Sequence, residues 1–285
     1  EEEVYAAVGL PWIPPELRED RGEIEAAQAG RLPRLVERGE LRGDLHVHSR
    51  YSDGSGTLED IAARARQLGL EWVAICDHSR SLKVAGGLEV EELLAKVREV
   101  REFNERSPDV KLLCGAEVDI DGRGALDYPD EVLARLDLVV AAIHSGFKQG
   151  EAAMTARTVA AMENPYVDVI AHPTGRLFGE REAYPLDMTA VLEAAARTGT
   201  ALEINAYPRR LDLNDVHSRA AAQKGVLLGI GSDAHLVDQM DYLALGLDVA
   251  RRAWLAPHQL LNTMTYGELK AWLAARRRDR SGTGP

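Results

Sequence analysis

The stretch GDLHVHSRYSDG, residues 43–54, places two histidines and an aspartate at the end of an expected strand. Side chains two residues apart on a strand point the same way, so His46 and His48 should share one face, with Leu45 and Val47 on the other. This is the geometry of a metal chelate. Two exposed or hydrogen-bonded histidines would also explain an isolated His-x-His, so the rest of the chain must decide.

Beyond Leu41, strand-like apolar runs alternate with amphipathic helical stretches. The expected strands are residues 44–48, 71–76, 110–118, 136–144, 167–172, 200–205 and 225–233, and the expected helices between them are residues 58–69, 89–105, 151–163, 187–199 and 214–225. Repeated strand and helix predict a parallel sheet. About seven such units favour a closed or nearly closed α/β barrel, because no Gly-x-Gly-x-x-Gly turn of an open doubly wound sheet follows the first strand.

Six of the seven expected strands end in residue types that bind metals: His46 and His48, Asp77 and His78, Glu117, His144, His172, and Asp233 with His235. In α/β barrels the loops at this end of the strands build the active site, so these side chains should converge. Taken singly, each of these residues could instead be a turn cap, a surface carboxylate or a loop residue with no role in metal binding. Of the eight histidines only His217 and His258 lie elsewhere, and we assign both to the surface or to structure.

Six imidazoles and at least three carboxylates exceed the four ligands of one tetrahedral zinc site, so the set predicts two or three divalent ions. Mixed nitrogen and oxygen donors suit Mn²⁺ and Zn²⁺ alike, and also iron. No cysteine lies at a strand end, which argues against a purely structural zinc site. Open coordination positions would activate water and hold a phosphoryl oxygen, as in hydrolysis of phosphate esters by several metals.

Composition limits the class of protein. With 285 residues, of which 45% are hydrophobic, the chain can bury a large core. Its net charge of −12 argues against a protein that wraps nucleic acid with its whole surface. Cys76 and Cys114 lie in apolar runs, which predicts buried reduced thiols and a cytoplasmic protein. We find no signal peptide, no membrane-spanning run and therefore no membrane partner.

The two ends of the chain differ from its middle. Residues 1–42 contain the proline-rich GLPWIPPELRED and a charged stretch, which indicates an end segment plus linker without a core. Residues 43–275 form the expected globular domain. Residues 276–285 are predicted to be a basic flexible tail.

The motifs DLHVHSRYSDG, CDHS, GAEVD, IHS, AHP and GSDAH, in this order and spacing, resemble those of the polymerase and histidinol phosphatase (PHP) superfamily. The resemblance implies a distorted seven-stranded β/α barrel with a trinuclear metal site at the carboxyl ends of the strands. It implies three sets of ligands: His46, His48, Glu117 and Asp233 for one ion, Glu117, His144 and His172 for a second, and Asp53, His78 and His235 for a third. All nine residues are present.

Three further stretches resemble bacterial family X DNA polymerases, in which a PHP domain follows the polymerase. EEEVYAAVGLPWIPPELRED is similar to the last part of their thumb, and DHSRSLKVAGGL and EINAYPRRLDL look like the same subgroup. The resemblance implies that residues 1–42 are the end of a thumb plus a linker, that the chain is the C-terminal part of a longer protein, and that polymerase domains of that protein are partners.

The function predicted from these motifs is a metal-dependent 3′-to-5′ exonuclease in DNA repair, acting on single-stranded or gapped DNA, with abasic-site cleavage or 3′-phosphate removal as related activities. A phosphatase of the histidinol-phosphate type and a non-enzymatic module that supports a polymerase are the alternatives. We predict Glu117, Asp233 and His144 as catalytic residues. Lys83, Asn205, Arg209 and Arg210 are the candidate substrate contacts, while the proton donor to the leaving group has no candidate.

Overall fold

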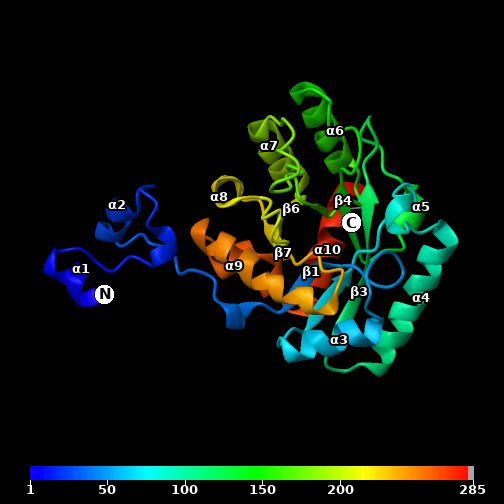
Figure 1. Cartoon of the computed structure of the whole chain (residues 1–285), viewed down its shortest axis with the longest axis horizontal. Coiled ribbons are helices and arrows are strands. Elements are labelled where there is room, and N and C mark those ends of the chain that lie inside the picture. Colours follow the sequence, from blue (N-terminus) through cyan, green and yellow to red (C-terminus); the bar gives the residue numbers. More distant parts are fainter. Residues whose placement is uncertain (282–285) are drawn as a thin grey trace.

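The computed structural model describes residues 1–281, with side chains up to Arg277, and its centre is a sheet of seven parallel strands in sequence order (Figure 1). The strands are β1 (Gly43–Val47), β2 (Trp72–Ile75), β3 (Lys111–Asp119), β4 (Leu138–Ala142), β5 (Val169–Ile170), β6 (Ala201–Asn205) and β7 (Leu228–Gly231). All seven lie inside or within one residue of the expected ranges. The predicted parallel α/β sheet is confirmed.

Helices follow the strands and surround the sheet (Figure 1). They are α3 (Leu58–Gln67), α4 (Val90–Arg106), α5 (Asp130–Leu133), α6 (Glu151–Glu163), α7 (Met188–Thr198), α8 (Asp215–Gln223), α9 (Leu243–Arg252) and α10 (Tyr266–Ser281), with 3₁₀ turns η3 (Lys83–Ala85), η4 (Val237–Tyr242), η5 (Pro257–Gln259) and η6 (Leu261–Thr263). Thr57 begins α3 with the expected cap, since its hydroxyl accepts a hydrogen bond from the Asp60 amide. None of the described helices is long and apolar enough to cross a membrane.

The last strand returns to the first and nearly closes the barrel. The Asp233 amide donates to the His46 carbonyl at 2.8 Å, and the His48 amide donates to the Ala234 carbonyl at 2.9 Å. The Asp44 carboxylate adds a side-chain connection by accepting from the amide and the hydroxyl of Ser232. These contacts confirm the predicted distorted seven-stranded barrel.

Apolar side chains pack in an inner and an outer layer. The inner cluster contains Leu45, Trp72 and Cys76 and is completed by residues of α10, whereas Val47 belongs to the outer cluster beneath the helices. Leu45 and Val47 therefore do not share a face as expected, because the register of β1 against β2 shifts between Asp44 and Val47. Both cysteines are buried and unpaired, as predicted.

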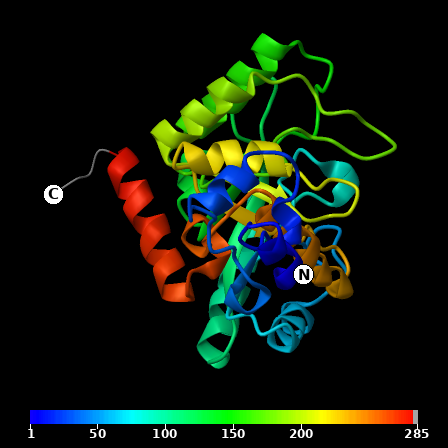
Figure 2. The same cartoon turned by 90° about the vertical axis from the view of Figure 1, so that its left-hand side faces the viewer.

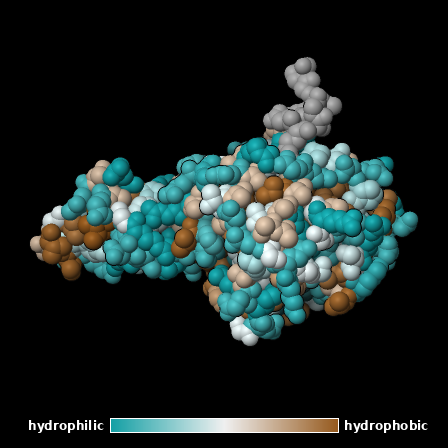
Figure 3. Space-filling view, turned by 90° about the horizontal axis from the view of Figure 1, so that it is seen from above, coloured by the Kyte–Doolittle hydropathy of each residue, from teal (hydrophilic) through white to brown (hydrophobic). Residues whose placement is uncertain are grey.

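Residues 1–42 form a small lobe beside the barrel (Figures 1 and 3). The lobe contains the helices α1 (Glu2–Ala7) and α2 (Glu23–Gln28) and the 3₁₀ turns η1 (Pro15–Leu17) and η2 (Arg38–Glu40). The expectation of a segment without a core is wrong, since Ile13, Leu17, Ala27 and Leu35 form a buried cluster. Glu16 pairs with Arg251 of α9 at 2.7 Å, which fixes the lobe to the barrel.

The basic C-terminal end also differs from the prediction of a flexible tail over residues 276–285. Residues up to Ser281 continue α10, which lies along one side of the molecule (Figure 2). Arg276 is buried and Arg277 half-buried, and both bind the carboxylate of Asp168 at the start of β5. The charges of these two arginines are therefore paired with the carboxylate of Asp168. Residues 282–285 lie outside the described part of the chain.

Candidate metal centre

The carboxyl ends of the strands bring all nine predicted metal ligands into one cluster. The residues are His46 on β1, His48 directly after β1, Asp53 in the loop that follows, His78 after β2, Glu117 on β3, His144 after β4, His172 after β5, and Asp233 and His235 after β7. All except Asp53, His144 and His235 are buried. The structure thus places the predicted residues together, while their role as ligands remains a prediction.

Glu117 lies at the centre of the cluster. Its Oε1 is 2.7 Å from Nε2 of His172 and 3.2 Å from Nε2 of His144. Its Oε2 is 2.9 Å from Nδ1 of His78 and 3.5 Å from Nε2 of His46. Nε2 of His48 lies 3.6 Å from the same Oε2. One carboxylate therefore faces five imidazoles, two at Oε1 and three at Oε2, which is the arrangement expected of a carboxylate that bridges two ions.

The cluster contains three sets of residues, and within each set the donor atoms lie no more than 4.8 Å from one another. The sets are His46, His48 and Asp233; His78, Glu117 and His144; and His48, Asp53, His78 and His235. The sets agree in outline with the grouping that the resemblance implies. They differ in that His48 and His78 each belong to two sets, and that His172 reaches the cluster through Glu117.

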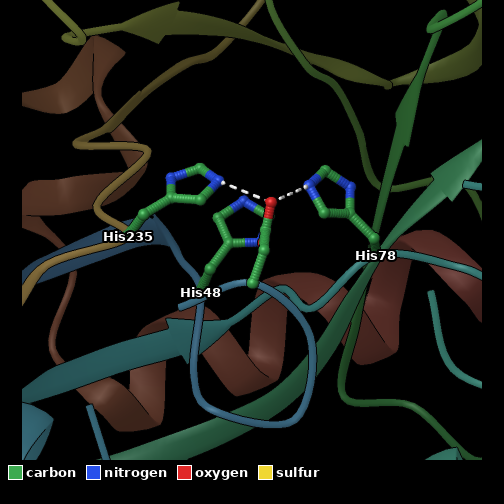
Figure 4. A group of neighbouring side chains, drawn as sticks. His48, His78 and His235 are labelled. Carbon is green, nitrogen blue, oxygen red and sulfur yellow. Dashed lines mark ion pairs between the residues drawn. The ribbon is translucent and has the colours of Figure 1, made fainter. Parts of the chain in front are cut away.

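The most open of these sets is drawn in Figure 4, where the rings of His48, His78 and His235 surround one point. The dashed lines run from His78 and His235 to one carboxylate oxygen, Oδ2 of Asp53, at 3.6 and 3.3 Å. Nδ1 of His48 lies 3.6 Å from the other oxygen of Asp53. Three elements distant in sequence thus converge on one carboxylate.

The backbone is unusual at two of these residues. His172 has φ of 27° and Asp233 has φ of 54°, values in the left-handed region that non-glycine residues seldom adopt. Each residue lies two positions after the end of its strand, β5 or β7. Such backbone persists where the surrounding structure fixes it, and it clusters at active sites.

The charges of the cluster are unbalanced without cations. Burial disfavours protonation of His78 and His144. Two carboxylates beside each ring, Glu117 and Asp53 for His78 and Glu117 and Asp119 for His144, together outweigh burial and raise the pKa to about 10 and about 9. For His48, burial and then the neighbouring His78 lower the pKa to about 4. Protonated imidazoles thus take the place that cations would have beside the carboxylates.

Several ring nitrogens also lack a proper partner among the described residues. Nδ1 of His48 and Nδ1 of His172 are buried without a hydrogen bond. Nε2 of His46 lies 3.1 Å from Nε2 of His48, so one of these two nitrogens donates a hydrogen bond and the other accepts it. Buried polar groups are normally satisfied, and a set of convergent nitrogens and carboxylate oxygens fits divalent ions.

Glu203 on β6 is a functional residue that the sequence analysis missed. It is fully buried, and its carboxylate contacts Nδ1 of His46 at 2.8 Å and accepts from the His172 amide at 2.6 Å. A carboxylate on the second ring nitrogen fixes the orientation of a metal-binding histidine. Asp119 binds Nδ1 of His144 in the same way. The available signal was the position of Glu203, two residues before Asn205 and so on the same face of the strand.

Gly231 makes room for the contact between Glu203 and His46. A Cβ atom at Gly231 would lie 2.3 Å from Oε1 of Glu203 and 2.5 Å from Cβ of His46. Any side chain at this position would therefore separate the carboxylate from the ring that it holds.

Asp77 is not one of the clustered donors. It is fully buried beside the ammonium of Lys96 at 2.8 Å, and it accepts hydrogen bonds from the amide of Ser49 and the hydroxyl of Ser52. Lys96 also donates to the carbonyls of Ile75 and Gly115. This buried pair therefore connects the strands β2 and β3 to the loop that carries Asp53.

The four predicted substrate contacts have different surroundings. Arg210 is mostly buried, with Nε 3.4 Å from Oδ2 of Asp233. Lys83 and Arg209 are exposed and pair with Glu89 and Glu180, respectively. Their contact with substrate remains a prediction.

Asn205 differs from the expectation of an amide that faces the substrate. It is fully buried, and its amide group donates to Oε2 of Glu203 and Oδ2 of Asp233, both at 3.1 Å. We therefore assign Asn205 to holding Asp233 in place. His217 on α8 and the exposed His258 in η5 lie outside the cluster.

Comparisons with known proteins show the family of this chain. The family model described as PHP domain matches residues 44–206, which is more than half of the chain. A DNA polymerase/3′-5′ exonuclease PolX of Bacillus subtilis is 42% identical over 273 residues, which are 96% of this chain and 48% of that protein. A probable phosphatase of Syntrophotalea carbinolica is 35% identical over 233 residues, which are 77% of this chain and 90% of that protein.

Among solved structures, the histidinol phosphate phosphatase of Lactococcus lactis, in complex with zinc, L-histidinol and phosphate, has a TM-score of 0.55. It is 15% identical, and the match covers 74% of this chain and 93% of that chain. At this identity the likeness concerns the fold. The chain spans about half the length of the Bacillus relative and nine-tenths of the phosphatase relative.

Proposed function

This chain belongs to the PHP domain family, and the relatives described above are named as a 3′-5′ exonuclease and a probable phosphatase. We propose that it is a metal-dependent phosphodiesterase that removes nucleotides from DNA 3′ ends. The observation that carries the proposal is the buried cluster of six histidines and three carboxylates around Glu117, in which every predicted ligand is present. A module that only supports a polymerase would not need this complete set.

The exonuclease is favoured over a small-molecule phosphatase by the extent of the match. A match over 96% of the chain must include most of residues 1–42, and the phosphatase match covers only 77%. The lobe formed by these residues is fixed to α9 through Glu16 and Arg251. This supports a protein in which polymerase domains of the same longer chain are partners, with a role in DNA repair.

The cluster would hold two or three divalent ions, Mn²⁺ or Zn²⁺, on mixed nitrogen and oxygen donors. Such ions lower the pKa of a water molecule and neutralise the oxygens of a phosphoryl group. Glu117, Asp233 and His144 would keep their donor atoms fixed around the reacting phosphate. Three further residues would keep the predicted metal ligands oriented, because each forms a direct contact with one of them. Glu203 contacts His46, Asp119 contacts His144, and Asn205 contacts Asp233.

Arg210 is the side chain best placed to bind the substrate phosphate. Its guanidinium lies beside Asp233, and its buried Nη1 has no hydrogen-bond partner among the described residues. A guanidinium with free N–H groups matches the geometry of a phosphate. We propose that it binds a non-bridging oxygen and offsets the charge that develops there.

The net charge of −12 gives the chain no general electrostatic attraction for DNA. We therefore expect it to act on single-stranded or gapped 3′ ends with a high KM, and we expect the polymerase domains to lower that KM. Abasic-site cleavage and 3′-phosphate removal would use the same ions and are further candidates.

The test is hydrolysis of a single-stranded oligonucleotide labelled at its 5′ end, with added Mn²⁺ or Zn²⁺, next to histidinol phosphate and p-nitrophenyl phosphate. We expect a ladder of products that shorten from the 3′ end. Rapid hydrolysis of the phosphomonoesters with no shortening of DNA would favour the phosphatase, which the similarity to the Syntrophotalea protein supports as the second candidate.

A further inference from the structure

A cavity of about 230 Å³ opens directly beside the metal centre. Asp233 and His235 line one side of it, and Tyr207, Arg210 and Leu177 line the rest, together with Gln239. A ligand in this cavity would meet the predicted metal ligands, a guanidinium and an aromatic ring at once. We call it the Tyr207 cavity.

The turn that carries Tyr207 and Arg210 is held rigidly. Its two ends are joined by a hydrogen bond of 2.6 Å from the backbone N–H of Asn205 to the backbone carbonyl of Asp212. Arg176 donates from Nε to the carbonyl of Arg210 at 2.9 Å and also binds the carbonyl of Leu211. The two side chains are therefore presented by backbone that needs little reorganisation when a ligand binds.

Tyr207 is fixed by a second aromatic ring. Its ring lies edge-to-face against Tyr242, with centroids 5.9 Å apart and an interplanar angle of 67°. The residue is half-buried and lines the cavity rather than closing it. A rigid, partly exposed aromatic ring is the usual platform on which proteins stack a nucleobase.

We propose that the Tyr207 cavity binds the 3′-terminal nucleoside of the substrate, with its base stacked on Tyr207 and its 5′ phosphate between Arg210 and the metal centre. This inference rests on the proposed function and adds to it a subsite for the base. Water attacks phosphorus, the bond from phosphorus to the 3′ oxygen of the preceding nucleotide breaks, and that oxygen takes a proton from solvent. The product is a nucleoside 5′-monophosphate.

The size of the cavity supports one nucleoside and no more. Pockets for drug-sized ligands measure about 300–1,000 Å³, and the Tyr207 cavity is smaller. We expect the cavity to admit the terminal base and not a second base on the 3′ side of the scissile phosphate. The cavity would therefore select a chain end over an internal position.

The experiment measures binding rather than turnover, using the full chain saturated with Mn²⁺ and isothermal titration calorimetry. The probes are thymidine 5′-monophosphate and 2-deoxyribose 5-phosphate, which share the phosphate and the sugar and differ in the base. We expect the nucleotide to bind about 10-fold more tightly, the order of magnitude that stacking of one base contributes. Equal affinities would overturn the proposal.

Three variants test whether Tyr207 causes the difference between the two affinities. Tyr207→Ala should reduce the ratio of the two affinities to within about twofold, whereas Tyr207→Phe should keep it, because the ring and not the hydroxyl is the platform. Phe178→Ala is the matched control, since Phe178 is an exposed aromatic residue of the neighbouring loop that does not line the cavity. A ratio unchanged by Tyr207→Ala, or lost equally in Phe178→Ala or Tyr207→Phe, would contradict the assignment.

The binding result and the proposed function can fail separately. A base preference that depends on Tyr207, in a protein that does not shorten oligonucleotides, would retain the cavity and refute the exonuclease. Shortening of oligonucleotides without any base preference in nucleotide binding would retain the exonuclease and refute the cavity.

Discussion

The barrel buries charged residues at both ends, and the two clusters differ in how well they are satisfied. At the amino ends of the strands, Oδ1 of Asp168 accepts from Arg276 at 2.7 Å, and Oδ2 accepts from Arg277 at 2.6 Å and from the Val139 amide at 2.9 Å. Both carboxylate oxygens therefore have strong donors from the chain itself, and the one buried atom left without a hydrogen bond among these three described residues is Nη1 of Arg276. This cluster attaches α10 to the barrel.

At the carboxyl ends, carboxylates and imidazoles converge without completing one another. Glu117 faces five histidines, while Nδ1 of His48 and Nδ1 of His172 have no hydrogen bond among the described residues. Burying charge is costly unless it is paired, so such a cluster is expected to persist where ions complete it. The difference indicates a structural cluster at one end and a functional one at the other.

The largest effect is expected from Glu117→Ala. Because Glu117 contacts histidines of two donor sets, its loss should disturb more than one ion and reduce hydrolysis to background. Rates on a labelled oligonucleotide and the metal content of the variant are the measurements. His217→Ala, outside the cluster, should stay within a few-fold of the unmodified protein, and equal effects of the two changes would contradict the assignment.

Removal of metal should also abolish activity, and its restoration should depend on pH. His78 and His144 must lose their protons to bind an ion, and the neighbouring carboxylates, Glu117 above all, hold their pKa at about 10 and about 9 against the effect of burial. Ion binding near neutral pH should therefore release protons, and affinity should rise as pH rises. Calorimetry in two buffers of different ionisation heat measures this release. An affinity that is the same at acidic and alkaline pH would show that these rings are not ligands.

Glu203→Gln should have an intermediate effect. The change keeps the size of the side chain but weakens the hold on His46 and on the His172 amide. Loss of such an outer partner typically costs about 10- to 100-fold in metal affinity or activity. The measurement is a metal titration in which activity is recorded at each metal concentration. The control is Glu193→Gln on the exposed face of α7. A result no different from that control would show that Glu203 has no part in the site.

The smallest effect on catalysis is expected at the other cluster. Asp168→Ala leaves Arg276 and Arg277 without their buried partner, so the free energy of unfolding should fall by about 3–5 kcal/mol. Activity per folded molecule should not change. Urea unfolding and assays at low temperature separate the two quantities. Lost activity with unchanged stability would reverse the roles of the two ends.

The sequence was sufficient for the elements whose signals are local. Alternating apolar runs predicted the strands, and Thr57 marked the start of α3. Metal-ligand residue types at successive strand ends predicted that His46, Glu117 and Asp233 would meet, because parallel strands in a barrel end on the same face.

Contacts between distant segments were not predictable in this way. Glu203 resembles any acidic residue until the barrel closes around it, and Lys96 resembles a solvated helix residue until it is found beneath Asp77. The register shift in β1 depends on its neighbour β2. Arg276 and Arg277 looked like a solvated tail because their partner, Asp168, lies more than a hundred residues earlier.

The most direct test of the difference between the two ends is the number of divalent ions that one chain binds, measured by elemental analysis after saturation and localised by anomalous scattering. We expect two or three ions, all among the histidines and carboxylates around Glu117, and none at Asp168. Fewer than two ions at saturation, or ions bound elsewhere, would contradict the proposal that the unsatisfied cluster is a multinuclear metal centre.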